Sequence, residues 1–196
     1  MRKKIAHGVG RLLKIPYPVF VALFIVGVVV SVLALRANNQ QMIKLRDEVF
    51  ASDKAGTGTE EALANLRSYV YSHMNTNLAS GGNAIKPPIQ LKYTYERLTA
   101  AEQAKTEAAN SKIYTDAQEY CQAKIPAGMS GSGRVSCVAD YVTSHGVKVK
   151  AVPAGLYQFD FLNPAWSPDL AGWSLVITTL TLILATSSFI RQRFTG

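Results

Sequence analysis

The sequence predicts two transmembrane helices that flank a mainly helical α+β extracytoplasmic domain, with about four helices and a small antiparallel sheet. Residues 18–35 and 171–190 form two uncharged, apolar stretches. At about 1.5 Å of rise per residue, each is long enough to cross the hydrocarbon core of a bilayer. Residues 36–162, between them, mix helical and alternating apolar patterns. An all-helical bundle is the alternative fold for this middle part.

The chain begins with a basic tail, residues 1–17, which fits either a short amphipathic helix on an anionic leaflet or a disordered tail. The apolar stretch that follows exceeds the roughly 7 to 15 residues of a secretory signal peptide. We therefore expect an uncleaved anchor at residues 18–35. Tyr17 lies where an interfacial aromatic side chain is expected.

Charge predicts the orientation of the chain. The two ends carry seven basic residues and no acid: Arg2, Lys3, Lys4, Arg11, Lys14, Arg191 and Arg193. Residues 36–169 hold the other 14 basic residues and all 13 acidic ones, a net charge of +1. The positive-inside rule then places both termini in the cytosol and residues 36–162 outside a cell (plasma or inner) membrane. The excess charge thus indicates topology, and no nucleic-acid partner is expected.

Two helices are predicted directly after the first span. An apolar stripe through Val49 extends the first helix as far as Gly56. A capping-box pair, Thr57 and Glu60, begins a second helix, which residues 80–83 end. The shared stripe predicts that the two helices pack as an antiparallel hairpin.

Residues 89–96 alternate apolar and polar side chains, which favours a strand, although the same residues also fit a helix. A capping box at Thr99 and Glu102 predicts a long helix that continues to about Lys124.

A short helix is expected at residues 136–145. Two more alternating runs, residues 147–151 and 157–161, flank a Pro-Ala-Gly turn. Together with residues 89–96 these runs predict a three-stranded antiparallel sheet.

The two cysteines, Cys121 and Cys137, are predicted to form a disulfide outside the membrane. In the chain-entropy model, closing this loop with a disulfide would stabilise the folded state by roughly 3 kcal/mol. Free thiols and a metal site with His145 are the alternatives. The spacing of these three residues matches no usual zinc pattern, so no metal is expected.

Residues 163–170 form a predicted interfacial elbow before the second span, and residues 191–196 form a second cytosolic tail. Trp166 and Trp173 lie at this boundary, where tryptophan prefers the headgroup region. A docking edge for a partner is the alternative reading of the elbow.

Small and hydroxyl side chains recur on one face of each span. They are Gly27, Ser31 and Ala34 in the first, and Ser174, Thr178, Thr181, Ala185 and Ser188 in the second. Such stripes let helices approach closely in lipid, so we expect these faces to pack together or against a partner's spans. The alternative is that each hydroxyl bonds its own helix backbone. No ionisable residue lies within either span, which leaves a transporter or proton relay unsupported.

No catalytic, phosphate-binding or dinucleotide motif occurs, so we expect neither an enzyme nor a cofactor. The layout of two spans around an external domain resembles that of bacterial chemoreceptor and Cache-type sensor modules, although no residue motif supports the resemblance. Only residues 191–196 follow the second span, so a sensor would need a partner to carry its signal. The leading expectation is an envelope protein that mediates interaction or assembly with another membrane or envelope protein, or self-association. A ligand-binding sensor or accessory subunit is the alternative.

Overall fold

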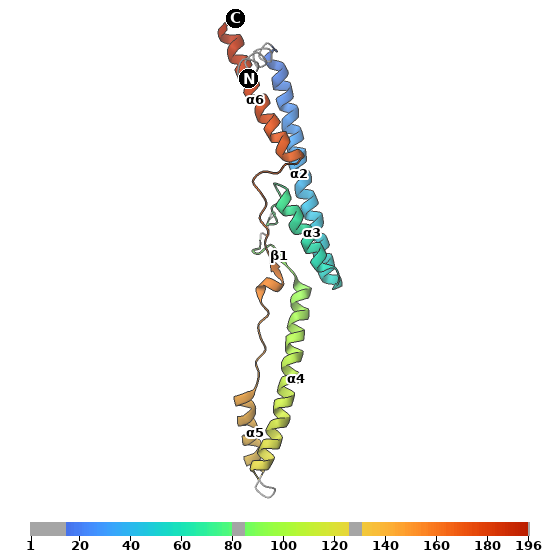
Figure 1. Ribbon diagram of the computed structural model, residues 1–196, viewed down its shortest axis with the longest axis vertical. Coiled ribbons are helices and arrows are strands. Elements are labelled where there is room, and N and C mark those ends of the chain that lie inside the picture. Colours follow the sequence, from blue (N-terminus) through green and yellow to red (C-terminus); the bar gives the residue numbers. More distant parts are fainter. Residues whose placement is uncertain (1–14, 80–84, 126–130, 196) are drawn as a thin grey trace, which may run out of the picture. The chain divides into compact units, whose positions relative to one another are not determined.

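The computed structural model describes residues 15–79, 85–125 and 131–195, which form five α-helices, one 3₁₀ turn and a two-stranded antiparallel sheet (Figure 1). The mainly helical fold with a small sheet is therefore confirmed. The chain divides into two compact units. Unit 1 comprises residues 1–89 and 160–196, and unit 2 comprises residues 90–159. The predicted external domain, residues 36–162, has parts in both units.

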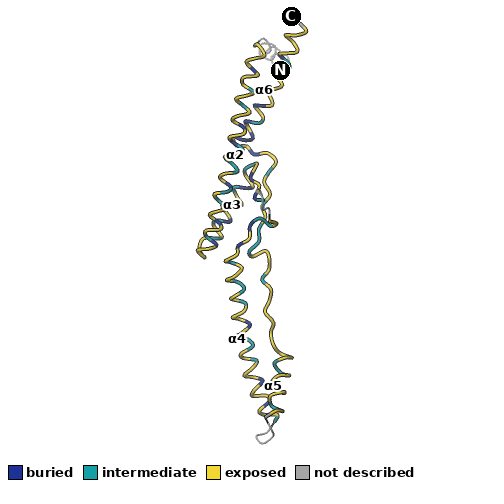
Figure 2. Tube along the Cα trace, turned by 180° about the vertical axis from the view of Figure 1, so that it is seen from behind, coloured by how far each residue is buried: buried dark blue, intermediate teal, exposed yellow. Residues whose placement is uncertain are grey.

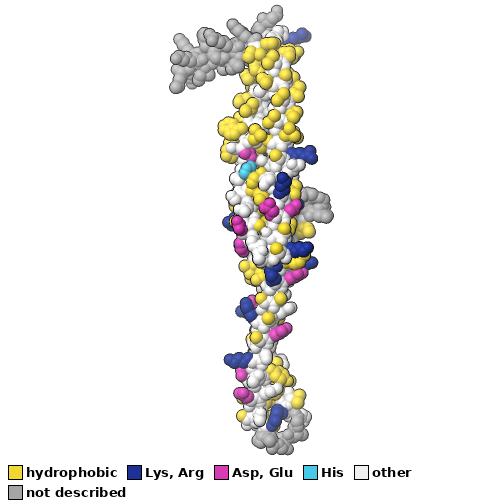
Figure 3. Space-filling model, turned by 90° about the vertical axis from the view of Figure 1, so that its right-hand side faces the viewer, with side chains coloured by type: hydrophobic (Ala, Val, Ile, Leu, Met, Phe, Trp, Pro, Cys, Tyr) yellow, Lys and Arg dark blue, Asp and Glu magenta, His cyan; other side chains and the backbone are white. Residues whose placement is uncertain are grey.

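Unit 1 contains two helices that are long and apolar enough to cross a membrane, α2 (Tyr17–Ala55) and α6 (Leu170–Thr195). They lie side by side over the first half of α2 (Figure 1). Figure 3 shows hydrophobic side chains covering this paired segment. As predicted, α2 continues beyond the apolar stretch without a break. It ends at Gly56, whose φ of 77° is a left-handed conformation that glycine adopts without strain.

The second half of α2 packs against α3 (Thr59–Ser72). The helices meet through fully or largely buried apolar side chains, namely Met42 and Val49 from α2 and Leu63, Leu66 and Val70 from α3. The predicted helical hairpin with a shared apolar stripe is therefore present in the structure. Its energetic basis is the removal of this stripe from water.

Both predicted ends of α3 are wrong. The helix begins after Gly58, and no side chain caps it, so Thr57 is not its N-cap. It ends at Ser72, well before residues 80–83, which lie outside the described residues. Ser72 Oγ donates to the carbonyl oxygen of Ser68 at 2.8 Å. His73 then turns to an extended conformation. Side chains that bond the last carbonyls in this way compete with continuation of the helix.

Unit 2 is built on α4 (Lys92–Lys124) and α5 (Gly131–His145). Cys121 of α4 and Cys137 of α5 are joined by the expected disulfide. Outside the helices, η1 (Ala154–Leu156) precedes the strand β2 (Gln158–Phe159), which pairs with the strand β1 (Ile89–Gln90).

The predicted strand at residues 89–96 and the predicted three-stranded sheet are wrong. Only residues 89–90 are a strand, and α4 begins at Lys92, seven residues before the predicted start at Thr99. The Leu91 N–H donates to the Tyr157 carbonyl at 2.8 Å, and the ring centroids of Tyr95 and Tyr157 lie 4.7 Å apart. Residues 147–151 form no strand. Leu91 and Tyr95, one helical turn apart, therefore both contact Tyr157.

Candidate functional site

The paired segment of α2 and α6 brings the two predicted small-residue faces together. Thr178 lies directly over Gly27, where an added Cβ would be 2.5 Å from Thr178 Oγ1. The hydroxyl oxygens of Ser31 and Thr178 are 3.3 Å apart. Along the two faces, the buried residues are Ser31, Ala34, Ser174, Thr178, Ala185 and Ser188, whereas Gly27 and Thr181 are half-buried. The close approach depends on the missing side chain at Gly27.

We call the contact between these two faces of α2 and α6 the seam. Its hydroxyl groups also bond to helix backbone. Ser31 donates to Gly27 O at 2.8 Å, Ser174 to Ala171 O at 2.9 Å and Thr181 to Thr178 O at 2.8 Å. Ser188 instead donates to Ile15 O at 2.9 Å, which ties α6 to the residues just before α2. The two interpretations of the stripe are compatible at Ser31, whose hydroxyl contacts Thr178 of the other helix and also donates to its own helix backbone.

The aromatic residues expected at the membrane interface lie at the two ends of the seam. Tyr17 contacts Phe189 edge to face, with ring centroids 5.4 Å apart. At the other end, Trp166 and Trp173 meet edge to face at 5.9 Å, and both remain about half exposed. Rings that are half buried suit the boundary between headgroups and water.

The basic residues that set the predicted topology are only partly described. Arg191 and Arg193 are exposed in the last turns of α6. The other five, Arg2, Lys3, Lys4, Arg11 and Lys14, lie outside the described residues.

A polar cluster just beyond the seam, which sequence reasoning missed, connects α2, the turn just after α3 and the start of α6. Asn38 donates to Asp169 Oδ2 at 2.7 Å and to Met74 O at 3.3 Å. The Gly172 N–H donates to Asp169 Oδ1 at 2.9 Å, and the Met74 N–H donates to Ser167 Oγ at 3.0 Å. We call these five residues the juxtamembrane cluster. An Asp directly before an apolar helix is an N-cap signal, and it could have identified this site.

The cluster favours a charged Asp169. Partial burial acts to raise the pKa of this carboxyl group, but hydrogen bonds from the Gly172 N–H, Asn38 and Ser167, with the charge of His73, hold the pKa below its ordinary value. Burial of Tyr69 raises the pKa of its hydroxyl group, and the negative charge of Asp169 adds to this effect. Asp169 therefore acts as an ionised acceptor that fixes the start of α6 to α2.

His73 and His145 occur in the same five-residue pattern, Tyr-Val-x-Ser-His, at the C-terminal ends of α3 and α5. His73 stacks on Tyr69 with centroids 4.0 Å apart, and His145 stacks on Tyr141 at 4.2 Å. The Nδ1 atom of each ring lies 2.9 to 3.0 Å from the preceding serine and 3.0 to 3.1 Å from a carbonyl four residues earlier. These contacts lie where the two helices end.

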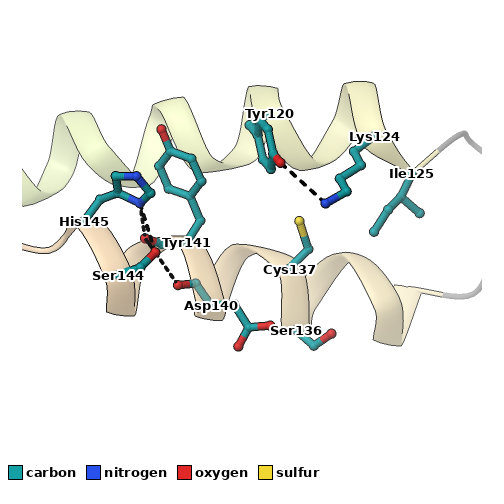
Figure 4. Close-up of a pocket in the computed structure, with 9 residues that line it drawn as sticks. All are labelled: Tyr120, Lys124, Ile125, Ser136, Cys137, Asp140, Tyr141, Ser144 and His145. Carbon is teal, nitrogen blue, oxygen red and sulfur yellow. Dashed lines mark hydrogen bonds between the residues drawn. The ribbon is translucent and has the colours of Figure 1, made fainter.

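An open pocket of about 590 Å³ lies between α4 and α5 next to the disulfide (Figure 4). Its lining residues are Tyr120, Lys124, Ile125, Ser136, Cys137, Asp140, Tyr141, Ser144 and His145. The rings of Tyr120 and Tyr141 are 5.3 Å apart, and Lys124 Nζ lies 5.5 Å from the Tyr120 centroid. The pocket can offer aromatic faces, one ammonium and one carboxylate to a ligand.

Metal binding has no support in the described part of the chain. Residues 15–79, 85–125 and 131–195 contain no group of three or more His, Cys, Asp or Glu side chains placed to hold an ion. Both cysteines are used by the disulfide. Comparison with known proteins gives no further assignment, because no protein-family model, curated protein or solved structure matches the chain.

Proposed function

We propose that this chain is a non-enzymatic, two-pass protein of the cell membrane, with cytosolic termini, whose external part binds another envelope protein. The two membrane-length helices and the basic residues at both ends support the topology. The disulfide supports an oxidising compartment for unit 2. The juxtamembrane cluster then serves to hold the turn after α3, at Met74, against Asn38 of α2 and next to the start of α6.

The observation that carries the proposal is the thin core of unit 2. Among its described residues, only Leu91, Thr106, Ala117 and Cys121 are buried, and Figure 2 shows how sparse the buried positions are along α4. Enzymes and small-molecule sites generally enclose their ligands in concave cavities that exclude water. A helix of 33 residues spans roughly 50 Å and instead presents a long, solvated surface. Such a surface suits a partner protein.

Site-specific photo-crosslinking in native membranes tests this proposal. A crosslinking residue at Tyr114, which is 51% exposed on α4, should capture a defined protein. The matched control is Val26, which is 59% exposed on the apolar part of α2 and should yield lipid adducts. If no protein is captured from Tyr114 or from other exposed positions around unit 2, the proposal is wrong.

The pocket between α4 and α5 supports a second candidate, an external sensor or accessory subunit that binds a small ligand and signals through a partner. Its volume of about 590 Å³ is within the range of ligand sites. Thermal unfolding of the full chain in detergent, screened against extracts of small molecules, tests it. A ligand that raises the melting temperature of the wild type, but not of Tyr141→Ala, favours the sensor. Tyr114→Ala, outside the pocket, is the matched control.

A further inference from the structure

The segment that follows α5, residues 147–152, is an extended and unpaired stretch of chain in unit 2. It runs from the end of α5 towards η1 beside α4 (Figure 1). Residues 147–151 are exposed and Val152 is half-buried. Among the described residues, no backbone N–H or C=O group of residues 148–152 has a hydrogen-bond partner in the protein. Extended backbone with free donors and acceptors is the template that β-pairing requires.

Asn110 of α4 fixes which edge of this segment is open. Its side-chain oxygen accepts the Val147 N–H at 2.8 Å, and its side-chain nitrogen donates to the Val147 carbonyl at 3.0 Å. Asn110 thus binds both backbone groups of Val147 as a neighbouring strand would. In an extended chain, successive residues direct these groups to opposite edges. The backbone groups of Lys148, Lys150 and Val152 therefore face away from Asn110.

A small pocket adjoins the same segment. It has a volume of about 210 Å³, and its walls come from α4, the extended segment and η1. Leu98, Val152, Pro153 and Leu156 make it mainly apolar, while Glu102 and Lys150 add charge at its lining. Peptides that add to a sheet edge gain affinity from backbone bonds and specificity from pockets for alternate side chains. Both parts of that recognition mode are present here.

The side chains of the segment determine what can pair with it. Residues 147–152 read Val-Lys-Val-Lys-Ala-Val, with two lysines and no acid. Antiparallel pairing with a second copy, centred on Val149 or on Lys150, sets lysine opposite lysine, and like charges at that spacing are destabilising. A strand with acidic side chains at alternate positions sets opposite charges together instead. The charge pattern thus disfavours self-pairing and favours an acidic segment.

We propose that the outward edge of residues 148–152 binds an extended, acidic segment of another protein by β-strand addition, with one apolar side chain of that segment in the adjoining pocket. This inference rests on the proposed interaction function and names its surface and the chemistry of its partner. Because Asn110 already holds the segment at Val147, part of the ordering cost of pairing is met before the partner arrives.

Proline substitution on the two edges tests the proposal with the full chain in detergent micelles. The probe is a fluorescein-labelled peptide, Thr-Glu-Val-Glu-Val-Glu-Thr, followed by fluorescence anisotropy. Lys150→Pro removes an outward N–H and should weaken binding about tenfold or more. The matched control, Val149→Pro, removes an N–H on the opposite edge, lies outside the lining of the pocket and should change the Kd less than about twofold. Proline suits the extended conformation in both variants, and circular dichroism with the melting temperature verifies folding.

Two further controls separate charge from backbone pairing. Lys150→Gln keeps the N–H, so it should weaken binding by only a few fold. The peptide with lysine in place of every glutamate should not bind. The proposal is overturned if the acidic peptide fails to bind the wild type, or if Lys150→Pro and Val149→Pro bind it equally well.

The crosslinking experiment then distinguishes this inference from the proposed function. If protein capture from Tyr114 persists in Lys150→Pro while peptide binding shows no edge dependence, the interaction function stands and the edge is wrong. If no protein is captured from any exposed position of unit 2, the interaction function itself fails. If the captured protein is lost with Lys150→Pro but retained with Val149→Pro, and the acidic peptide shows the same pattern, the edge is its binding site.

Discussion

Replacing Gly27 by alanine gives a direct test of the seam between α2 and α6. The new Cβ would lie 2.5 Å from Thr178 Oγ1 and 3.3 Å from Thr178 Cβ, closer than carbon and oxygen atoms normally approach. The Ser31–Thr178 hydroxyl contact, at 3.3 Å, lies one turn away and would be stretched by any separation of the helices. We therefore expect Gly27→Ala to destabilise the paired helices.

The expected magnitude follows from three opposing contributions. Overpacking a tight contact costs about 1 to 3 kcal/mol. Losing a hydroxyl bond between membrane helices costs about 0.6 kcal/mol. Alanine's higher helix propensity offsets up to about 1 kcal/mol of this loss. With the full offset of about 1 kcal/mol, the net loss in the free energy of unfolding should be about 0.6 to 2.6 kcal/mol.

Reversible unfolding with SDS in mixed micelles measures this free energy. The variant Thr178→Ala alone should lose about 0.6 kcal/mol. The double variant Gly27→Ala/Thr178→Ala should lose less than the sum of the two, by about 1 kcal/mol, because the clashing oxygen is gone. The control Val26→Ala, on the exposed face of α2, should change the free energy by less than about 0.5 kcal/mol. A stabilised Gly27→Ala, or strictly additive losses, would refute the reasoning.

Three other predictions concern the parts outside the seam. Met42→Ala, at a fully buried contact between α2 and α3, should lower the free energy of unfolding by about 2 to 5 kcal/mol, measured in the same SDS titration. Reduction of the Cys121–Cys137 bridge, or Cys121→Ser, should cost unit 2 about 3 kcal/mol in the chain-entropy model, and thermal unfolding of the serine variant should no longer respond to reductant. Because the pKa of Asp169 is lowered in the folded state, its stabilising contribution is present above the ordinary Asp pKa of about 3.9 and is lost as pH falls through the lower folded value. Asp169→Asn should therefore flatten the melting-temperature profile in this acidic range, and an unchanged profile would contradict the role of the cluster.

Features with strong local signals were predicted correctly from the sequence. The continuous first helix up to Gly56 follows from an apolar stripe and a left-handed glycine stop. The Cys121–Cys137 pairing follows from the presence of only two cysteines. The end of α5 at His145 follows from the glycine after it. Each of these depends on residues that are close in sequence or unique in type.

Features that depend on distant contacts were not predictable in the same way. Residues 89–96 carry both a period of two and a helical pattern, and in the structure Tyr95 lies in a helix and contacts the distant Tyr157. The juxtamembrane cluster unites Asn38 with Asp169, which are 131 positions apart. Residues 147–151 have strand composition but lack a neighbouring strand in the fold, and propensity alone does not supply one.

The unbroken length of α2 has a mechanical consequence. Its roughly 20 residues beyond the apolar stretch extend about 30 Å, rigidly continuous with the part that is long enough to cross a membrane. Transmembrane helices adjust to bilayer thickness by tilting. A tilt of about 10° around the membrane boundary would displace the far end of α2 sideways by about 5 Å, and α3 with it, because the two helices share a core. In a bilayer, the hairpin of α2 and α3 would therefore convert a change in tilt, and so in bilayer thickness, into a lateral movement of its far end.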